Sequence, residues 1–435
     1  MIKRIIDQLR SRLSRRTRTD RGPARPAAKP TDHIAQGERL YAAGNLLEAE
    51  ARFARALRDT PSDARALNGL GVIRLAAGRN EEARELFRAA MEAQPDFALA
   101  YSNLSVVEAR LGSFSTAADY ARRALSIDPE LDEAQITLAE SLVISRDFDE
   151  AQRHFHAAAA AHGKWRIAGT IRFDRGYWES LRDESVDATP LDIRLDVPPD
   201  RIAGPVLLLG CDPRYCRLFL GPLIESLDVA EHPSPVVHLH VIGDEPGLIT
   251  RIGQFSSRYP GVRLVVSAEP GPAGLEDAQR RVYYACARFL VLRQLLARYR
   301  CPIFVFDVDA VFRGSLADVA HAAQGADLGL YLRRPQRIVW TNVAAGRFLV
   351  NPTPGAEAFL RVLEAYIRRA VRERRMDWFL DQVALYCCLT LMRRYDQAPA
   401  VYELNDDLDR VMHAFPAGFS EKLDDPLYTQ HFVEF

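Results

Sequence analysis

The chain has 435 residues, of which 48% are hydrophobic and 26% are charged, a composition typical of a soluble globular protein with more than one domain. No apolar run is long enough to span a membrane, and the N-terminus lacks the apolar core of a secretory signal. The net charge is −1, but the charges are distributed unevenly along the chain. Residues 1–30 hold ten Lys and Arg against two Asp, a net charge of +8, which leaves −9 on the other 405 residues. This negative balance argues against nucleic acid as the main partner.

Residues 1–30 are predicted to form a basic head and linker. Five apolar residues between Ile2 and Leu13 share one face of a predicted helix, with the basic residues mostly elsewhere, and a linker rich in Pro and Ala follows. A basic amphipathic start of this kind predicts peripheral contact with an anionic membrane surface through residues 1–18. A solvated tail, or a helix that caps the next domain, explains the same pattern.

Residues 31–164 repeat with a period of 34, marked by Pro61, Pro95 and Pro129. Small residues recur at Gly37, Gly71, Ser105 and Ala139, turn residues at Gly44, Gly78, Gly112 and Arg146, and aromatic residues at Phe53, Phe87, Tyr120 (displaced by one) and Phe155. Alanine columns recur at 49, 83, 117 and 151 and at 56, 90, 124 and 158. The pattern resembles four copies of the tetratricopeptide repeat. The resemblance implies stacked helix pairs whose groove binds a peptide or protein, while docking on the next domain or dimerisation is the alternative.

Residues 165–202 combine charge clusters with several prolines and are predicted to be a connector. From residue 203 to 435, short β-branched runs alternate with longer segments of helical period, which predicts an α/β layer fold. Strands are expected at 205–209, 236–242, 262–266, 303–306, 328–332 and 343–350. Helices are expected at 215–227, from after residue 244 to about residue 259, and at 279–299, 355–374 and 378–392. The tail from residue 401 onward is expected to be irregular.

Two acids, Asp307 and Asp309, follow the apolar strand at 303–306. Carboxylates at the end of a buried strand need compensation, and a divalent cation with oxygen ligands is the usual form of it. Because strand residues two apart point the same way, both acids can share one ion, although a solvated turn is the simpler alternative. The segments Gly210–Asp212 and Gly243–Asp244 also follow strands, so three loops are expected around one crevice at the carboxyl ends of the sheet.

The stretches YYACARFLVL, PIFVFDVDAVF, VAAGRFLVNPT, DWFLDQVAL and, loosely, HAFPAGFSEK occur in an order that resembles GT-A-fold glycosyltransferases of the family 8-like group, over roughly residues 203–430. The resemblance implies a Rossmann-like nucleotide-diphospho-sugar transferase that uses Mn²⁺ or Mg²⁺. It implies that Asp307 meets the nucleotide and the metal and that Asp309 is the principal metal ligand. The third ligand would be His413 in a segment with Gly418 and Lys422, with Lys422 on the pyrophosphate. The spacing departs from the family's, so His431 is a rival ligand.

The resemblance also implies roles for residues outside the acid pair. Asp381 faces the sugar or acts in catalysis beside the donor-binding Gln382, with helix capping or pairing to an arginine as the alternative for Asp381. Arg288 is expected on the phosphates, with Arg280, Arg281 or a plain salt bridge of Arg288 as the alternatives. The donor-binding set is completed by Gly210 and Asp212. Residues 344–346 read Ala-Ala-Gly where the family has Asn-Ala-Gly, which leaves the donor sugar open, and no general base is identified, which leaves the stereochemistry open.

Two other interpretations fit parts of the same pattern. FDVDAV matches the first motif of haloacid-dehalogenase-like phosphatases. In that interpretation Asp307 is the nucleophile, Asp309 is the acid/base, and Asp406-Asp407 is a second acid pair for Mg²⁺. Against it, that motif normally lies on the first strand of the fold, whereas three predicted strands precede it here. A repeat scaffold with an inactive transferase domain is the other. The favoured expectation is a hexosyltransferase whose repeats recruit a protein, glycan or lipid-linked acceptor. The six cysteines form no C-x-x-C pair, so reduced thiols and a cytoplasmic location are expected.

Overall fold

The computed structural model describes residues 30–162, 165–185, 190–196, 202, 204–230, 236–333 and 339–413. The basic head, apart from residue 30, lies outside these residues, as do Lys422 and His431. The chain divides into two compact units, Met1–Gly169 and Thr170–Phe435. Every helix in the described ranges is too short or too polar to cross a membrane.

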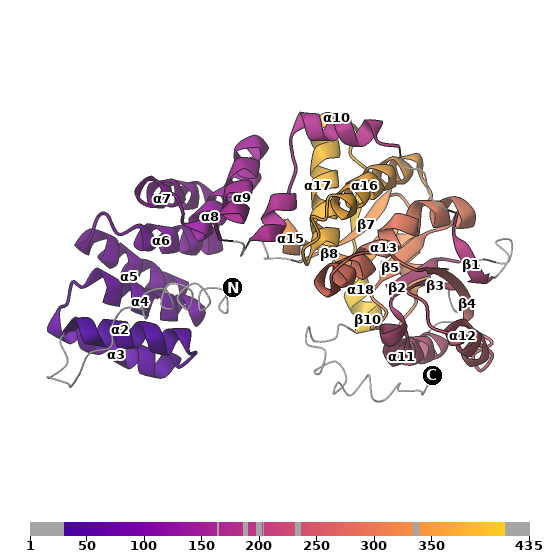
Figure 1. The fold of residues 1–435 in the computed structure, drawn as a ribbon, viewed down its shortest axis with the longest axis horizontal. Coiled ribbons are helices and arrows are strands. Elements are labelled where there is room, and N and C mark those ends of the chain that lie inside the picture. Colours follow the sequence, from indigo (N-terminus) through magenta and orange to yellow (C-terminus); the bar gives the residue numbers. More distant parts are fainter. Residues whose placement is uncertain are drawn as a thin grey trace. The chain divides into compact units, whose positions relative to one another are not determined.

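The N-terminal unit is a solenoid of eight described helices in four consecutive pairs (Figure 1). The pairs are α2 (Pro30–Ala42) with α3 (Leu46–Asp59), α4 (Ala64–Ala76) with α5 (Asn80–Ala93), α6 (Ala98–Leu111) with α7 (Phe114–Ile127), and α8 (Asp132–Ile144) with α9 (Phe148–His162). Each second helix also packs on the first helix of the next pair. The predicted repeat of 34 residues therefore corresponds to one helix pair.

The small-residue column exists because an aromatic ring fills the space beside it. A Cβ on Gly37 would lie 2.7 Å from the ring of Phe53, and a Cβ on Gly71 would lie 2.5 Å from the ring of Phe87. A Cβ on Gly69, outside the column, would lie 2.6 Å from Phe53, so this ring is wedged between α2 and α4. In the third repeat the column holds the larger Ser105, and the aromatic position holds the smaller, fully buried Ala121. The third repeat therefore has an alanine where the first, second and fourth have a phenylalanine, and its aromatic residue, Tyr120, lies one position earlier.

The turn column places its residues in the left-handed backbone region. Gly44, Gly78 and Gly112 have φ of 86°, 75° and 93°, and Arg146 has φ of 65° in the fourth repeat. Glycine adopts this conformation without steric cost, whereas an arginine does not. The fourth repeat thus keeps the turn with a residue poorly suited to it.

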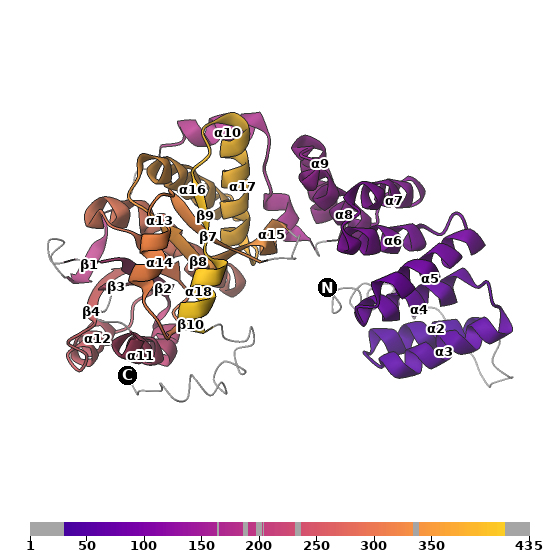
Figure 2. The same ribbon diagram turned by 180° about the vertical axis from the view of Figure 1, so that it is seen from behind.

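The C-terminal unit is built on a sheet of eight described strands in the order β1-β4-β3-β2-β5-β8-β7-β9 (Figures 1 and 2). The strands are β1 (Asp192–Leu195), β2 (Val206–Cys211), β3 (Val236–Ile242), β4 (Arg263–Glu269), β5 (Ile303–Phe306), β7 (Leu328–Leu332), β8 (Val343–Val350) and β9 (Val401–Glu403). Strands β4, β3, β2 and β5 run parallel, while β8 is antiparallel to both β5 and β7. A separate two-stranded sheet pairs β6 (Val311–Phe312) with β10 (Met412–His413).

Helices cover both faces of the large sheet. The apolar core on one face includes side chains of α11 (Pro213–Ala230), α12 (Leu248–Ser256), α14 (Leu316–Ala322) and α18 (Asn405–Val411). Figure 2 shows α14 and α18 side by side, and they are in contact. The helices α13 (Asp277–Tyr299), α16 (Pro354–Arg372) and α17 (Leu380–Tyr395) contact one another, and α13 and α17 contact β2 and β8. A short helix, α15 (Val339–Asn342), precedes β8.

The expected α/β layers are present, and two segments carry more structure than the sequence indicates. Residues 165–202, predicted to be a connector, contain the 3-10 helix η1 (Arg166–Thr170), the helix α10 (Arg175–Asp183) and β1, which pairs antiparallel with β4. The tail predicted to be irregular from residue 401 contains β9, α18 and β10. These elements are two to nine residues long, too short for a period in the sequence to reveal them.

Candidate active site

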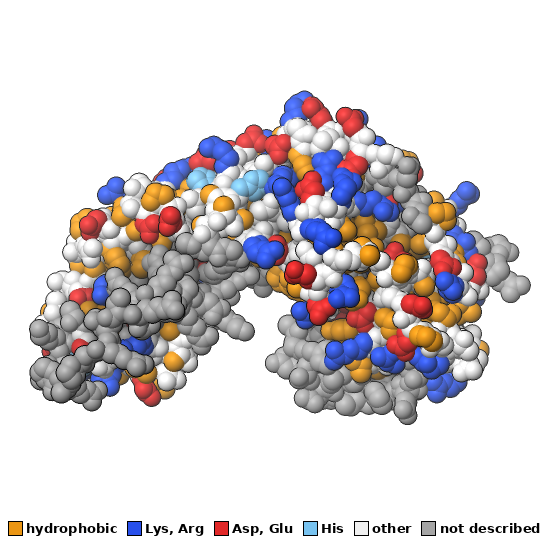
Figure 3. Space-filling view, in the orientation of Figure 1, with side chains coloured by type: hydrophobic (Ala, Val, Ile, Leu, Met, Phe, Trp, Pro, Cys, Tyr) orange, Lys and Arg blue, Asp and Glu red, His pale blue; other side chains and the backbone are white. Residues whose placement is uncertain are grey.

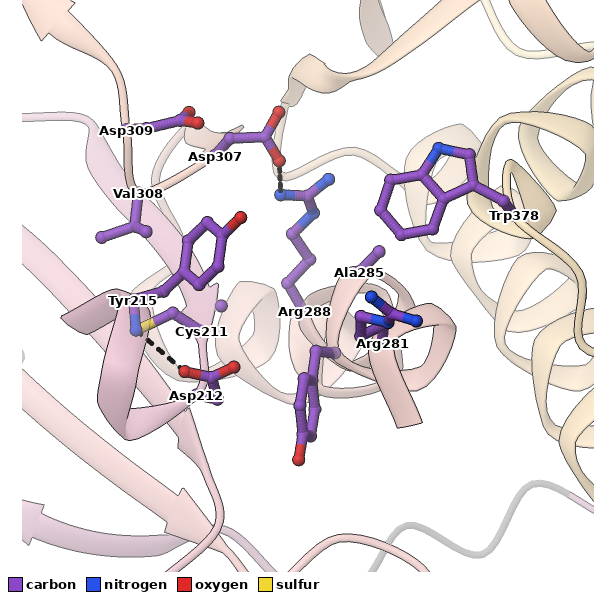
Figure 4. Close-up of a pocket in the computed structure, with 12 residues that line it drawn as sticks. Cys211, Asp212, Tyr215, Arg281, Ala285, Arg288, Asp307, Val308, Asp309 and Trp378 are labelled. Carbon is purple, nitrogen blue, oxygen red and sulfur yellow. Dashed lines mark hydrogen bonds and ion pairs between the residues drawn. The ribbon is translucent and has the colours of Figure 1, made fainter. Parts of the chain in front are cut away.

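A pocket of about 280 Å³ opens at the carboxyl ends of β2 and β5. These two strands are neighbours, while the chain runs from β2 outward to β3 and β4 on the other side, so the strand order reverses here. In open parallel sheets a ligand binds at such a reversal. The loops after both strands line the pocket, and Figure 4 shows Asp212 and Tyr215 on one side of it and Asp307 and Asp309 above. The Gly243–Asp244 segment follows β3 as expected but is absent from the pocket lining.

Asp307 and Asp309 both line the pocket, as the spacing predicts, and a buried arginine holds the first of them. Nη1 of Arg288 donates to Asp307 Oδ1 at 2.5 Å and to the Phe306 carbonyl at 3.1 Å. The Arg288 side chain is 3% exposed, whereas that of Asp307 is 60% exposed. The negative charge of Asp307 is therefore compensated by an ion pair and by solvent. Its desolvation penalty is smaller than that of a carboxylate at the end of a fully buried strand.

Asp381 lies on the other side of the same arginine. Its Oδ2 is 3.5 Å from Arg288 Nη2, and its side chain is 9% exposed. Burial raises the pKa of Asp381 to about 6, against the opposing effect of Arg288. Burial alone would lower the pKa of Arg288, but the charges of Asp307 and Asp381 raise it. Asp381 does not line the pocket, and its ion pair with Arg288 connects it to the pocket lining.

Gln382 points away from the pocket. Its side-chain amide faces the carbonyl oxygens of Val343 and Trp340, at 2.9 and 3.0 Å, which places its nitrogen on that side. Its backbone N–H donates to Asp381 Oδ1 at 2.8 Å. Gln382 thus ties the start of α17 to α15 and β8, a structural role distinct from the donor contact that the resemblance implies.

Two glycines shape the site, and the sequence singles out only one of them for it. A Cβ on Gly210 would lie 3.2 Å from the Cβ of Arg288, so the expected Gly210 allows α13 to approach β2. A Cβ on Gly346 would lie 2.0 Å from Asp307 Oδ2. Gly346 is therefore required by the position of the Asp307 carboxylate, and its pattern in the sequence, a glycine inside a strand, signals a close approach. Asp212 accepts from the Tyr215 backbone N–H at 2.8 Å and caps α11 while lining the pocket.

The proposed third metal ligand lies near the acid pair through the pairing of two short strands. His413 on β10 is the register partner of Val311 on β6, two residues after Asp309. Within the described residues, however, no three side chains of His, Cys, Asp or Glu converge into a metal-binding group. The carboxylates of Asp307 and Asp309 are the hard oxygen donors that Mn²⁺ or Mg²⁺ prefers, so the pair fits such an ion without a third protein ligand assigned.

The second acid pair of the phosphatase interpretation lies elsewhere. Asp406 and Asp407 are on α18, and neither lines the pocket. Asp407 accepts from the hydroxyl of Tyr402 on the edge strand β9 and pairs with Arg410. The structure thus separates this pair from Asp307 and Asp309.

Comparison with known proteins identifies the N-terminal region. The tetratricopeptide repeat family profile matches residues 34–96 and 74–132. Solved structures similar to this chain include MamA, at 18% identity over 37% of this chain and 87% of that chain, with a TM-score of 0.28. TTC0263, a thermophilic TPR protein of Thermus thermophilus, is 22% identical over 33% of this chain and 80% of that chain, with a TM-score of 0.30. Another is the first TPR of Spaghetti (RPAP3) bound to an HSP90 peptide, at 18% identity over 23% of this chain and 81% of that chain, with a TM-score of 0.23. No curated protein matches the sequence. The N-terminal region carries tetratricopeptide repeats.

Proposed function

We propose that residues 203–435 form a metal-dependent glycosyltransferase with a GT-A-like fold, which moves a sugar from a nucleotide diphosphate to an acceptor. The observation that carries the proposal is the position of the acid pair. Asp307 and Asp309 line a pocket at the reversal of strand order between β2 and β5, the position at which open parallel sheets bind nucleotides.

The charge of the site supports the same proposal. Four carboxylates, those of Asp212, Asp307, Asp309 and Asp381, stand against the guanidinium groups of Arg281 and Arg288, which leaves a formal charge of −2. A divalent cation held by Asp307 and Asp309 neutralises this charge and would stabilise the negative charge that develops on a leaving diphosphate. Arg288 is bound to Asp307 by an ion pair, and the charges of Asp307 and Asp381 raise the pKa of Arg288.

The repeat unit would recruit the acceptor. Stacked tetratricopeptide repeats present an extended surface that binds peptides or proteins in many repeat proteins. Figure 3 shows Lys and Arg side chains interspersed with Asp and Glu side chains on the face in view. In the repeat unit, exposed side chains of opposite charge also pair, as Arg88 does with Glu85 on α5. A mixed surface of this kind favours a protein or glycan acceptor over nucleic acid.

Thermal unfolding with nucleotides tests the proposal. The full chain is heated with nucleoside diphosphates and nucleotide-sugars, with and without Mn²⁺, beside Asp309→Ala and a control, Asp318→Ala, which removes an exposed acid on α14. We expect a nucleotide to raise the melting temperature only with Mn²⁺, in the native chain and in Asp318→Ala but not in Asp309→Ala. If no nucleotide shifts the native chain, the transferase proposal is wrong.

A further inference from the structure

Trp378 is an exposed aromatic side chain at the rim of the pocket. The other three tryptophans of the chain, Trp165, Trp178 and Trp340, are 3%, 2% and 0% exposed, whereas Trp378 is 59% exposed. Figure 4 shows its indole on the opposite side of the pocket from Asp212 and Tyr215. An uncovered indole at the rim of a pocket that also holds charged side chains is accessible to a ligand bound in that pocket.

The loop that carries Trp378 is held in an unfavourable backbone conformation. It joins α16 to α17, and the residues Arg374 and Phe379 have φ of 54° and 78°, which bulky side chains rarely adopt. Met376 and Leu380 are buried on either side of Trp378 and anchor the loop. Strained backbone of this kind persists where the surroundings over-determine it, most often at functional sites.

Contacts of the same loop fix it against the segment that leads into α13. Nη1 of Arg374 donates to the Gly274 carbonyl at 2.6 Å, and Nε2 of Gln279 donates to the Arg374 carbonyl at 3.4 Å. Arg281 follows Gln279 on α13 and also lines the pocket. The contacts therefore join the loop that carries Trp378 to the beginning of the helix that carries Arg281.

Arg281 contributes a positive charge to the pocket. Among the described residues it has no hydrogen bond or ion pair, and it is exposed. Its neighbour Arg280 is paired with Asp277 at 2.5 Å, and Arg288 is paired with Asp307 and Asp381. Arg281 and Arg288 lie seven residues apart, two turns on one face of α13, with the small Ala285 between them. Of these three arginines, Arg281 is the one available to a ligand.

The side of the pocket on which Trp378 lies indicates which part of the substrate it meets. If the proposed function holds, the nucleotide occupies the side at β2, with Asp212 and Tyr215, and its diphosphate reaches the acid pair. Trp378 comes from the opposite side, between α16 and α17, so it faces the space left for the acceptor. An indole face stacks on the apolar face of a sugar ring, and a guanidinium binds a carboxylate or phosphate.

We propose that Trp378 and Arg281 form the acceptor subsite of the proposed transferase and that they bind a saccharide carrying an anionic group. The ring lies on the indole, and its carboxylate or phosphate is bound by Arg281. The inference rests on the proposed function for the identity of the acceptor, and on the exposed indole and the guanidinium of Arg281 for the chemistry of the ligand.

Acrylamide quenching of tryptophan fluorescence tests the subsite, because the buried tryptophans are shielded and the quenchable emission comes from Trp378. The full chain is titrated with glucose, glucuronate, glucose 6-phosphate, inorganic phosphate and triglutamate at constant ionic strength. We expect both anionic sugars to protect the emission at concentrations about tenfold lower than glucose, and phosphate and triglutamate not to protect it. Protection by only one of the two anionic sugars identifies the anion as carboxylate or phosphate. Trp378→Phe should abolish the quenchable component, which verifies the reporter.

Matched variants separate the charge of Arg281 from general effects of arginine. Arg281→Gln should reduce the preference for anionic sugars over glucose to about twofold or less, while Arg280→Gln, which changes an arginine already paired, should preserve it. Equal protection by glucose and the anionic sugars, or stronger protection by triglutamate, would overturn the inference. So would protection by a nucleoside diphosphate that competes with the anionic sugars, since Trp378 would then belong to the nucleotide site.

The Mn²⁺-dependent nucleotide shift is measured on the same samples. A nucleotide shift without sugar protection sinks the subsite and leaves the transferase proposal standing. Protection by anionic sugars without a nucleotide shift supports the chemistry of the subsite and rejects the transferase.

Discussion

The charges of the pocket depend on one buried side chain, Arg288, which joins an exposed carboxylate to a buried one. Asp307 keeps access to solvent and to a ligand, while Asp381 is shielded, and burial raises its pKa to about 6. A guanidinium that satisfies both acids makes the site sensitive to the protonation of a group that does not line the pocket.

The first prediction concerns the pH dependence of stability through Asp381. Its pKa is about 6 in the folded protein, above the ordinary value of 3.8, so the folded state binds the proton more tightly than the unfolded state. The stability that this group contributes is present below about pH 4 and is lost as pH rises through 6. Between pH 4 and 7 the loss should reach about 2 kcal/mol, because each pKa unit corresponds to 1.36 kcal/mol. Urea unfolding of the native chain and of Asp381→Asn at both pH values measures it, and parallel pH profiles for the two proteins would contradict it.

The second prediction concerns Gly346. In Gly346→Ala the new Cβ would lie 2.0 Å from Asp307 Oδ2, so the carboxylate must move from its present position beside Arg288. We expect the Mn²⁺-dependent affinity for a nucleotide to fall at least about tenfold, with a small loss of stability because the Asp307 side chain is exposed. The control is Gly325→Ala, where a Cβ meets open space. Equal nucleotide binding by both variants would show that the position of Asp307 is unimportant.

At the scale of elements, short strands and turns decide where functional groups lie. The antiparallel pair β6–β10 brings His413 opposite Val311, so a histidine distant in the sequence is held beside the loop of the acid pair. In the repeats, the inter-helix turn uses glycine three times and arginine once. The fourth repeat therefore stores backbone strain that the other three avoid.

The third prediction follows from that strain. Replacing Arg146, at φ of 65°, by glycine should stabilise the repeat unit by about 1 kcal/mol, since glycine tolerates this conformation. Gly112→Ala at φ of 93° should destabilise it by a similar amount. Arg146→Lys keeps the strain and serves as the control. Thermal unfolding followed by circular dichroism measures all three, and an unchanged or lowered melting temperature for Arg146→Gly would refute the explanation.

At the scale of the whole molecule, the chain divides into two compact units. One apolar cluster is formed by residues of α2–α7, and another by the sheet of the C-terminal unit and the helices on one of its faces. Each of these two clusters contains residues of one unit alone.

The fourth prediction is that the units fold independently. A fragment of residues 170–435 should fold and keep the nucleotide binding proposed for the full chain, because the pocket is lined by residues of that unit alone. A fragment of residues 30–169 should show helical circular dichroism and its own unfolding transition. The comparison of nucleotide-induced thermal shifts between fragment and full chain tests this, and a fragment that is folded but does not bind, while the full chain does, would assign part of the site to the repeats.

Much of the architecture can be predicted from the sequence. The repeats appear as columns at a period of 34, because each helix pair must bury the same small and aromatic positions. The strands β3, β5, β7 and β8 are predicted with the bounds that the structure has, since β-branched runs between polar turns are local signals. The acid pair at the end of β5 is also a local pattern, as is the left-handed turn glycine.

Only the tertiary structure decides which side chains meet. Arg288 contacts acids 19 and 93 residues away, Gly346 makes room for Asp307, and Gln382 turns toward Trp340 instead of the pocket. These contacts depend on the strand order, with β8 inserted antiparallel beside β5, and on which face of the sheet α13 and α17 cover. Local periodicity carries no information on strand order, because the free energy that selects it comes from packing between segments distant in the sequence.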